Sequence, residues 1–163
     1  MKHADFPPLH ETGDLIDHIL SRYHNTHRTE LAALQPLAQK VEIVHADDPA
    51  APIGLARTLA NLAQRMEDHM MKEELILFPA MRANARNGIE NPISVMRRDH
   101  VEHAEYIEEI KRLTADLTPP DHACGSWRAL YAGTQKLLDD LTQHIVLEND
   151  MLFPRFERNL RGH

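Results

Sequence analysis

The sequence is poor in the residues that build disulfide-linked or sheet-rich proteins. It contains one cysteine, Cys124, together with 6 glycines and 5% aromatic residues among 163 positions. A single cysteine cannot form an internal disulfide, which fits a reducing compartment. The scarcity of glycine, beside long stretches of alanine, leucine, glutamate, glutamine, arginine and methionine, favours helices over sheets. We therefore expect an all-α protein.

Two further absences exclude classes of partner. No apolar run approaches the length that spans a bilayer, and residues 1–8 (MKHADFPP) lack the apolar core of a signal peptide. The net charge is −7, and neither a basic stripe nor an aromatic stacking platform is visible. We expect a cytoplasmic protein whose main partner is neither nucleic acid nor membrane. The length suits one domain with one core.

One phrase occurs twice in the chain. Residues 69–79 read HMMKEELILFP and residues 144–154 read HIVLENDMLFP, so that both copies follow the pattern H-x-x-x-E-x-x-x-L-F-P. On an α-helix, residues four apart lie on one face, one turn apart, and the imidazole and carboxylate of each copy can reach the same point. Two such faces predict a cradle for two metal ions.

Apolar residues recur at helical spacing in four stretches. The stretches are residues 16–41, 55–80, 93–110 and 130–151. Pro36 lies inside the first and should kink or interrupt that helix, because proline has no N–H to donate. We expect the second helix to close near Asn87–Gly88 and the third to open on Asn91–Pro92. Segments 44–52 and 117–126 are rich in helix breakers and are interpreted as loops.

Histidine and glutamate occupy inward positions of these helices where leucine is expected. Burying an unpaired carboxylate or several imidazoles costs several kcal/mol unless something compensates, and a bound metal ion is the economical compensation. The apolar face continues past the carboxylates through Ile76 in the second helix and Met151 in the fourth. The candidate metal ligands are His24, His69, Glu73, His100, His144 and Glu148.

The repeat extends beyond the eleven-residue phrase. The pair His24-x-x-His27 matches His100-x-x-His103 with an offset of 76 residues, and the two H-x-x-x-E copies are offset by 75. A duplicated helix hairpin accounts for both offsets with one inserted or deleted residue. We expect an antiparallel four-helix bundle over residues 12–160, after an extension of residues 1–11, with one site at its centre.

The type and number of ligands constrain the metal. Imidazole with carboxylate suits iron, manganese, zinc and copper. Four histidines and two glutamates divide into two ions, each bound by two imidazoles and one oxygen from each of two bridging carboxylates. For octahedral iron, a bridging oxo or hydroxo group would add a fifth ligand and leave one position open for O2 or NO, whereas a structural site would be closed. For His27 and His103 a ligand role and an outer hydrogen-bonding role both remain open, and we favour the second.

Several blocks of the sequence resemble the hemerythrin-like domain of the repair-of-iron-centres (RIC) proteins, over nearly the whole chain from about Asp14 to Phe156. The blocks are residues 15–24, 44–49, 69–74, 92–96 and 144–149. The resemblance implies an oxo-bridged di-iron protein that protects or repairs iron-sulfur clusters after nitrosative or oxidative stress, by delivering iron, handling NO, or both. It implies terminal ligands at His24, His69, His100 and His144 and bridging carboxylates at Glu73 and Glu148.

Two positions depart from the family pattern. His45 matches a histidine implicated in the family's iron site, but it follows His24 by 21 residues, roughly 30 Å along a continuous helix, and we leave it out of the ligand set. The usual RIC protein also carries a small N-terminal domain with adjacent cysteines, whereas only Met1–Glu11 precede the bundle here. We expect any step that needs those thiols to require another protein.

Three functions are consistent with these residues. The first is repair of damaged iron-sulfur proteins, with NO reduction at the di-iron centre left open. The second is an O2- or NO-binding or sensing module, or an iron reservoir, without catalysis. The third is a helical bundle stabilised by zinc or manganese and without a redox role. All three use the same six ligands, so the sequence alone does not separate them.

Overall fold

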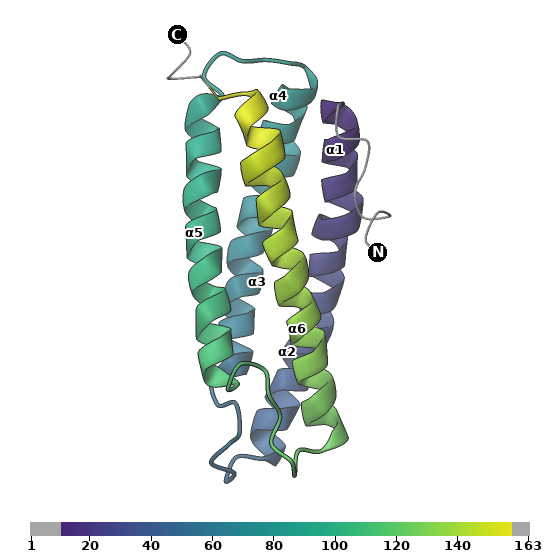
Figure 1. The fold of residues 1–163 in the computed structure, drawn as a ribbon, viewed down its shortest axis with the longest axis vertical. Helices are drawn as coiled ribbons and strands as arrows, with labels where there is room; N and C mark the ends of the chain where they lie inside the picture. Colours follow the sequence, from purple (N-terminus) through teal and green to yellow (C-terminus); the bar gives the residue numbers. More distant parts are fainter. Residues whose placement is uncertain (1–10, 158–163) are drawn as a thin grey trace.

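A computed structural model describes residues 11–157 as an antiparallel bundle of four long helical runs (Figure 1). The first run comprises α1 (Thr12–His18), η2 (Ile19–His24) and α2 (Asn25–Val44); the second comprises α3 (Leu55–Lys72), η3 (Glu73–Leu77) and α4 (Phe78–Arg82). The third is α5 (Glu90–Leu113), and the fourth comprises α6 (Gly125–Val146), η4 (Leu147–Leu152) and η5 (Phe153–Arg155). No strand occurs within residues 11–157, which confirms the predicted all-α bundle. None of the helices in this range is long and apolar enough to cross a membrane.

The structure bears on two expectations about the helices: Pro36 leaves the first run unbroken, and the second run ends earlier than expected. Pro36 does not interrupt the first run, because α2 continues through it and packs against α3 and α6. The second run ends at Arg82 rather than near Asn87–Gly88. Asn84 adopts a left-handed conformation with φ 55°, and the N–H of Ala85 bonds back to the carbonyl of Ala80 at 2.9 Å, a common way to end a helix.

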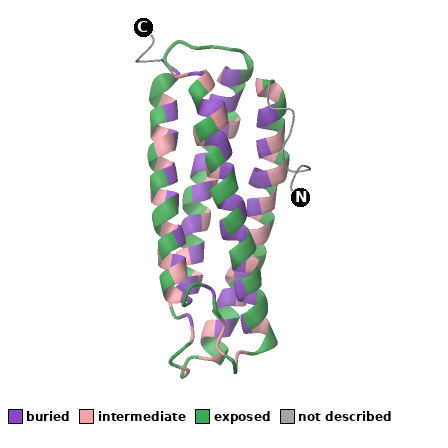
Figure 2. Ribbon diagram, viewed as in Figure 1, coloured by how far each residue is buried: buried purple, intermediate pink, exposed green. Residues whose placement is uncertain are grey.

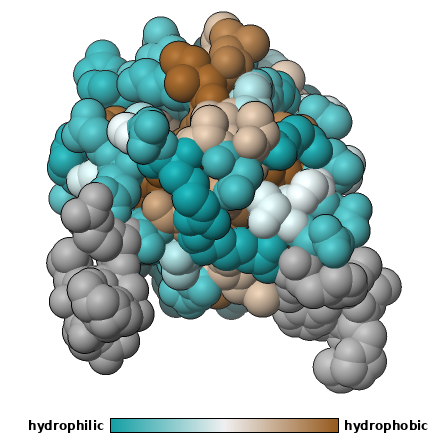
Figure 3. All heavy atoms as spheres, turned by 90° about the horizontal axis from the view of Figure 1, so that it is seen from above, coloured by the Kyte–Doolittle hydropathy of each residue, from teal (hydrophilic) through white to brown (hydrophobic). Residues whose placement is uncertain are grey.

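The buried side chains lie along the inner faces of the four runs (Figure 2). They form two apolar clusters, one around Trp127, Leu59 and Leu137, and one around Phe78 and Phe153 near the opposite end. Viewed from the end that holds α4, hydrophilic side chains cover much of the described surface (Figure 3). Along each run, the predicted ligands fall between the two clusters, so that the bundle has a polar layer within an apolar core.

Three π-helical segments, η2, η3 and η4, interrupt the α-helices at the level of this polar layer. A π turn adds a residue to one turn of helix and rotates everything that follows. Leu77 and Leu152 are therefore buried, whereas Ile76 is 63% exposed and Met151 is only partly buried. The prediction that Ile76 faces the core is wrong for this reason, whereas Met151 still packs against the apolar cluster around Phe78 and Phe153.

Candidate metal centre

All six predicted ligands converge at the middle of the bundle, and every long run contributes at least one of them. They form two groups of four that share both glutamates, and within each group one ligand atom per residue lies within 4.8 Å of the others. The groups are His24, Glu73, His144 and Glu148, and His69, Glu73, His100 and Glu148.

Each glutamate presents one carboxylate oxygen to each group. Glu73 places Oε1 at 3.0 Å from the Nε2 atom of His24 and Oε2 at 3.2 Å from the Nε2 atom of His69. Glu148 places Oε1 at 2.8 Å from Nε2 of His100 and Oε2 at 2.9 Å from Nε2 of His144. This is the arrangement that two bridging carboxylates need.

The cluster is buried, and its inner atoms lack adequate partners. The side chains of the six residues are 0–3% exposed. Four inward atoms make no hydrogen bond of acceptable geometry within the described residues: Nε2 of His69, Nε2 of His100, Oε2 of Glu73 and Oε1 of Glu148. Each unsatisfied buried polar atom costs about 1–3 kcal/mol. A cation in each group would meet these atoms, and imidazole nitrogens with carboxylate oxygens are a suitable donor set.

The charges within the cluster favour an ionised Glu148 and a protonated His69. Burial acts to raise the pKa of Glu148, but the imidazoles of His144 and His100 outweigh it and hold that pKa well below its usual range. Burial likewise acts to lower the pKa of His69, but the nearby carboxylates, Glu73 first among them, raise it well above 6.5. Glu148 is thus ready to bind a cation, which would displace the proton from His69.

The second nitrogen of each ligand histidine, Nδ1, has its own partner outside the cluster. The Nδ1 contacts are His24 with Oε2 of Glu74 at 2.7 Å, His69 with Oδ2 of Asp99 at 3.0 Å, His100 with Oδ1 of Asn149 at 2.8 Å, and His144 with Nε2 of His27 at 3.1 Å. Such partners fix the orientation of the ring and leave Nε2 for the metal. Helical spacing alone did not indicate Glu74, Asp99 and Asn149 as partners. Each is adjacent in sequence to a predicted ligand, and that adjacency was the available signal.

The remaining histidines of residues 11–157 lie outside both groups. His103 is 2% exposed, and neither of its ring nitrogens has a hydrogen-bond partner in the described part of the chain; its ring centroid is 5.0 Å from that of His69. His45 follows the uninterrupted α2, and its Nε2 lies 3.2 Å from Sγ of Cys124. The chain does not reverse to bring His45 back to the cluster, in keeping with its omission from the ligand set.

Because of two buried histidines, His27 and His103, we expect the metal-free protein to lose stability as the pH falls. Burial, together with the neighbouring imidazoles, lowers the pKa of His27 to about 2 and that of His103 to about 3. In the unfolded chain both rings take up a proton near pH 6.5, so protons favour the unfolded state below that pH. Lowering the pH from 6.5 to 5 should cost about 2 kcal/mol of unfolding free energy for each ring. The raised pKa values of His24 and His69 do not add to this loss, because a group that binds its proton more tightly in the folded state favours that state as the pH falls.

Urea unfolding of metal-free protein at the two pH values measures this loss. The variant His103→Leu should show about half of it, because one of the two rings is gone. The matched control is His122→Gln, which removes an exposed imidazole and should leave the loss unchanged. An unchanged loss in His103→Leu would contradict the assignment of the pH dependence to this buried ring.

Comparison with known proteins shows that most of the chain matches a cation-binding domain. The model of the hemerythrin HHE cation binding domain matches residues 15–156. The chain is 48% identical over 143 residues to the iron-sulfur cluster repair protein YtfE of Dickeya chrysanthemi, and 49% identical over 143 residues to proteins of that name from Citrobacter koseri and Escherichia coli. Each alignment covers 88% of this chain and 65% of the relative, so the chain spans about two thirds of the length of these relatives.

Proposed function

Since this chain belongs to the hemerythrin HHE cation-binding family, we propose that its central cluster holds two iron ions and that the protein serves the repair of iron-sulfur clusters damaged by nitrosative or oxidative stress. The proposed ligands are His24, His69, Glu73, His100, His144 and Glu148. The name of the YtfE relatives supports the repair role, and iron-sulfur proteins are the proposed clients.

The observation that carries the two-metal proposal is the division of each carboxylate between two histidine pairs. A single ion would need only one of the two groups, and the second pair of imidazoles would then be buried without compensation. Four protein ligands for each ion leave positions open in six-coordinate iron. Iron bound there would supply redox chemistry and a place for a small ligand such as NO or O2.

The protein's own contribution is orientation and the exclusion of water. The Nδ1 partners hold each ring with Nε2 toward the centre, and the two apolar clusters close the layer on both sides. The stacked ring of Phe78, 5.7 Å from His24, and that of Phe153, 5.7 Å from His100, pack against ligands from the same apolar end. A dry, pre-oriented donor set needs no large rearrangement when a cation enters or leaves.

Recovery of a damaged client enzyme tests the repair role. An iron-sulfur dehydratase inactivated by NO should regain activity when incubated without air, under reducing conditions, with an equimolar amount of the iron-loaded protein. The controls are metal-free protein and the variant His69→Ala, both of which should restore little, together with the same amount of free ferrous ion in the presence of a chelator.

Other outcomes of these experiments would contradict repair and favour another function. Reversible NO binding with both irons retained and no recovery of the client would overturn repair and indicate a gas-binding or sensing module or an iron reservoir. Conversion of NO to N2O at a steady rate would identify an enzyme. A protein that binds only zinc or manganese would leave the bundle without a redox role.

A further inference from the structure

The internal duplication allows the outer partners of the two halves to be compared residue by residue. His24 and His100 are equivalent, and their Nδ1 partners Glu74 and Asn149 are equivalent as well, at an offset of 75. One partner is a carboxylate and the other a neutral amide. The carboxylate, however, is accompanied by a cation, Arg28.

Arg28 forms an ion pair with Glu74 that offsets part of its negative charge. Its Nη1 donates to Oε2 of Glu74 at 2.8 Å and its Nη2 to Oε1 at 3.1 Å, while its Nε donates to Glu67 at 2.8 Å. The residue equivalent to Arg28 at an offset of 76 is Ala104, so the acid and the base are absent together from the other half. His24 is therefore backed by a carboxylate whose charge is partly offset by Arg28, which also pairs with Glu67, and His100 is backed by a neutral amide.

The equivalence fails at the other pair of ligands, His69 and His144. His69 meets the carboxylate of Asp99, and Asp99 forms no ion pair with a lysine or arginine within residues 11–157, although Lys72 lies near enough to lower its pKa. The equivalent of Asp99 at an offset of 76 is Tyr23, whose ring stacks on His144 with centroids 5.5 Å apart.

The Nδ1 atom of His144 consequently faces a neutral group. Its partner is Nε2 of His27, an imidazole that is completely buried. A carboxylate that accepts the Nδ1–H proton makes the opposite nitrogen a stronger metal ligand, and loss of such a partner lowers metal affinity roughly 10–100-fold. Among the four ligand histidines of the described residues, only His69 has a carboxylate partner that forms no ion pair with a lysine or arginine.

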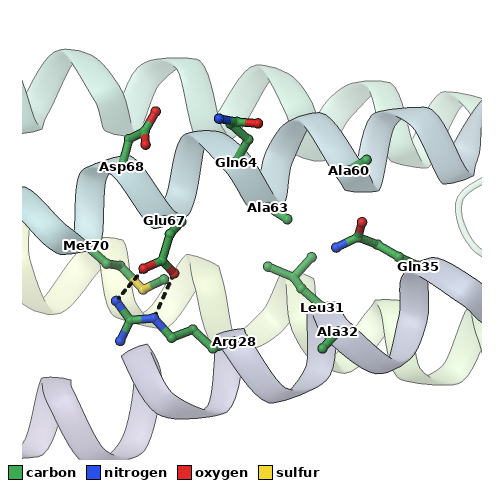
Figure 4. Close-up of a pocket in the computed structure, with 10 residues that line it drawn as sticks. All are labelled: Arg28, Leu31, Ala32, Gln35, Ala60, Ala63, Gln64, Glu67, Asp68 and Met70. Atoms are coloured by element: carbon green, nitrogen blue, oxygen red, sulfur yellow. Dashed lines mark hydrogen bonds and ion pairs between the residues drawn. The ribbon is translucent and has the colours of Figure 1, made fainter.

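We propose that the two metal positions are unequal: the position of His69 and His100 fills first and retains its ion, whereas the position of His24 and His144 holds the exchangeable ion, kept weak by Arg28. This inference rests on the proposed metal centre and deepens it, because it identifies which ion would be given up. Arg28 and Glu67 line one end of a groove of about 550 Å³ between α2 and α3, so the cation that pairs with Glu74 borders solvent (Figure 4).

Anaerobic titration of the metal-free protein with ferrous ion against a competing chelator tests the inequality. Two binding steps are expected, with dissociation constants that differ by at least about tenfold. Asp99→Asn should weaken the first step and bring the two constants within about threefold of each other. Arg28→Gln should also bring the two dissociation constants closer together, but by strengthening the second step. Without Arg28, the negative charge of Glu74 is no longer offset by a bonded cation.

A matched control and a folding check accompany these variants. Asp68→Asn removes an exposed carboxylate beside His69 in sequence and should leave both steps unchanged. Helix content and thermal unfolding of each metal-free variant show whether it folds, and the two test variants act on opposite steps, so one suffices if the other fails to fold.

Three results would overturn the inference. They are equal affinities in the unmodified protein, a wider difference in Asp99→Asn, and a weaker second step in Arg28→Gln. Two ions bound with equal affinity would contradict the inequality of the positions but not the proposed metal centre. A folded protein that binds no iron would contradict both proposals.

Discussion

Replacing Glu148 with alanine is expected to abolish binding of both metal ions, reducing the metal content from about two ions per chain to nearly none. Glu148 presents one oxygen to each group, so its loss removes a ligand from both positions at once. Because loss of a mere outer partner lowers affinity roughly 10–100-fold, loss of a shared ligand should leave neither ion bound through purification. Elemental analysis of protein purified without air measures the outcome.

The control for this experiment is a variant that lacks a carboxylate far from the metal ligands and should keep its metal content. Glu108 is exposed on α5 and makes no hydrogen bond or ion pair in the described structure, so Glu108→Ala should retain both ions. Helix content by circular dichroism verifies that each variant is folded. Retention of two irons by Glu148→Ala would disprove the bridging role, and zinc in place of iron in the unmodified protein would disprove the redox function.

The bundle and the convergence of the six candidate ligands could be predicted from the sequence because both depend on helical periodicity. Residues four apart share a helix face wherever the helix is placed, so His69 and Glu73 are together before any tertiary contact is known. The duplication then supplied the second half and the antiparallel arrangement. Burial of polar residues at leucine positions indicated the centre of the bundle.

The π turns could not be predicted in the same way. They place one extra residue in a turn at the level of the cluster, and nothing in the local sequence distinguishes η3 from ordinary α-helix. The geometry that favours them is tertiary, since four runs must direct side chains to a common point. Ile76 therefore looked like a core residue by its spacing and is exposed in the structure.

The hydrogen-bond partners of the Nδ1 atoms could not be predicted from helical periodicity either, for a different reason. Asp99 lies on the flank of α5, and only the packing of α3 against α5 brings its carboxylate to His69. Tyr23 occupies the equivalent position of the first run, but its ring stacks on His144 instead of accepting a hydrogen bond from a ligand histidine. Sequence repeats thus predicted what the halves share, whereas the structure was needed to show where they differ.

Removal of the metal ions is expected to lower the free energy of unfolding by about 5 kcal/mol when each ion is present at 100 times its dissociation constant, since each such ion contributes about 2.7 kcal/mol. For a domain of this size, that loss corresponds to a fall in Tm of roughly 10–20 °C. The physical source is the polar layer: without cations, the buried carboxylate and imidazole atoms lack satisfactory partners.

Thermal unfolding followed by circular dichroism, with and without a chelator, measures this effect. Glu148→Ala is the internal control, because a variant that binds no metal should show no dependence on the chelator. An unchanged Tm in unmodified protein that elemental analysis shows to be stripped would mean that the apolar clusters alone determine stability. The expected fall would instead mean that the ions compensate for the polar residues in the core, so that giving up an ion to a client costs the protein part of its own stability.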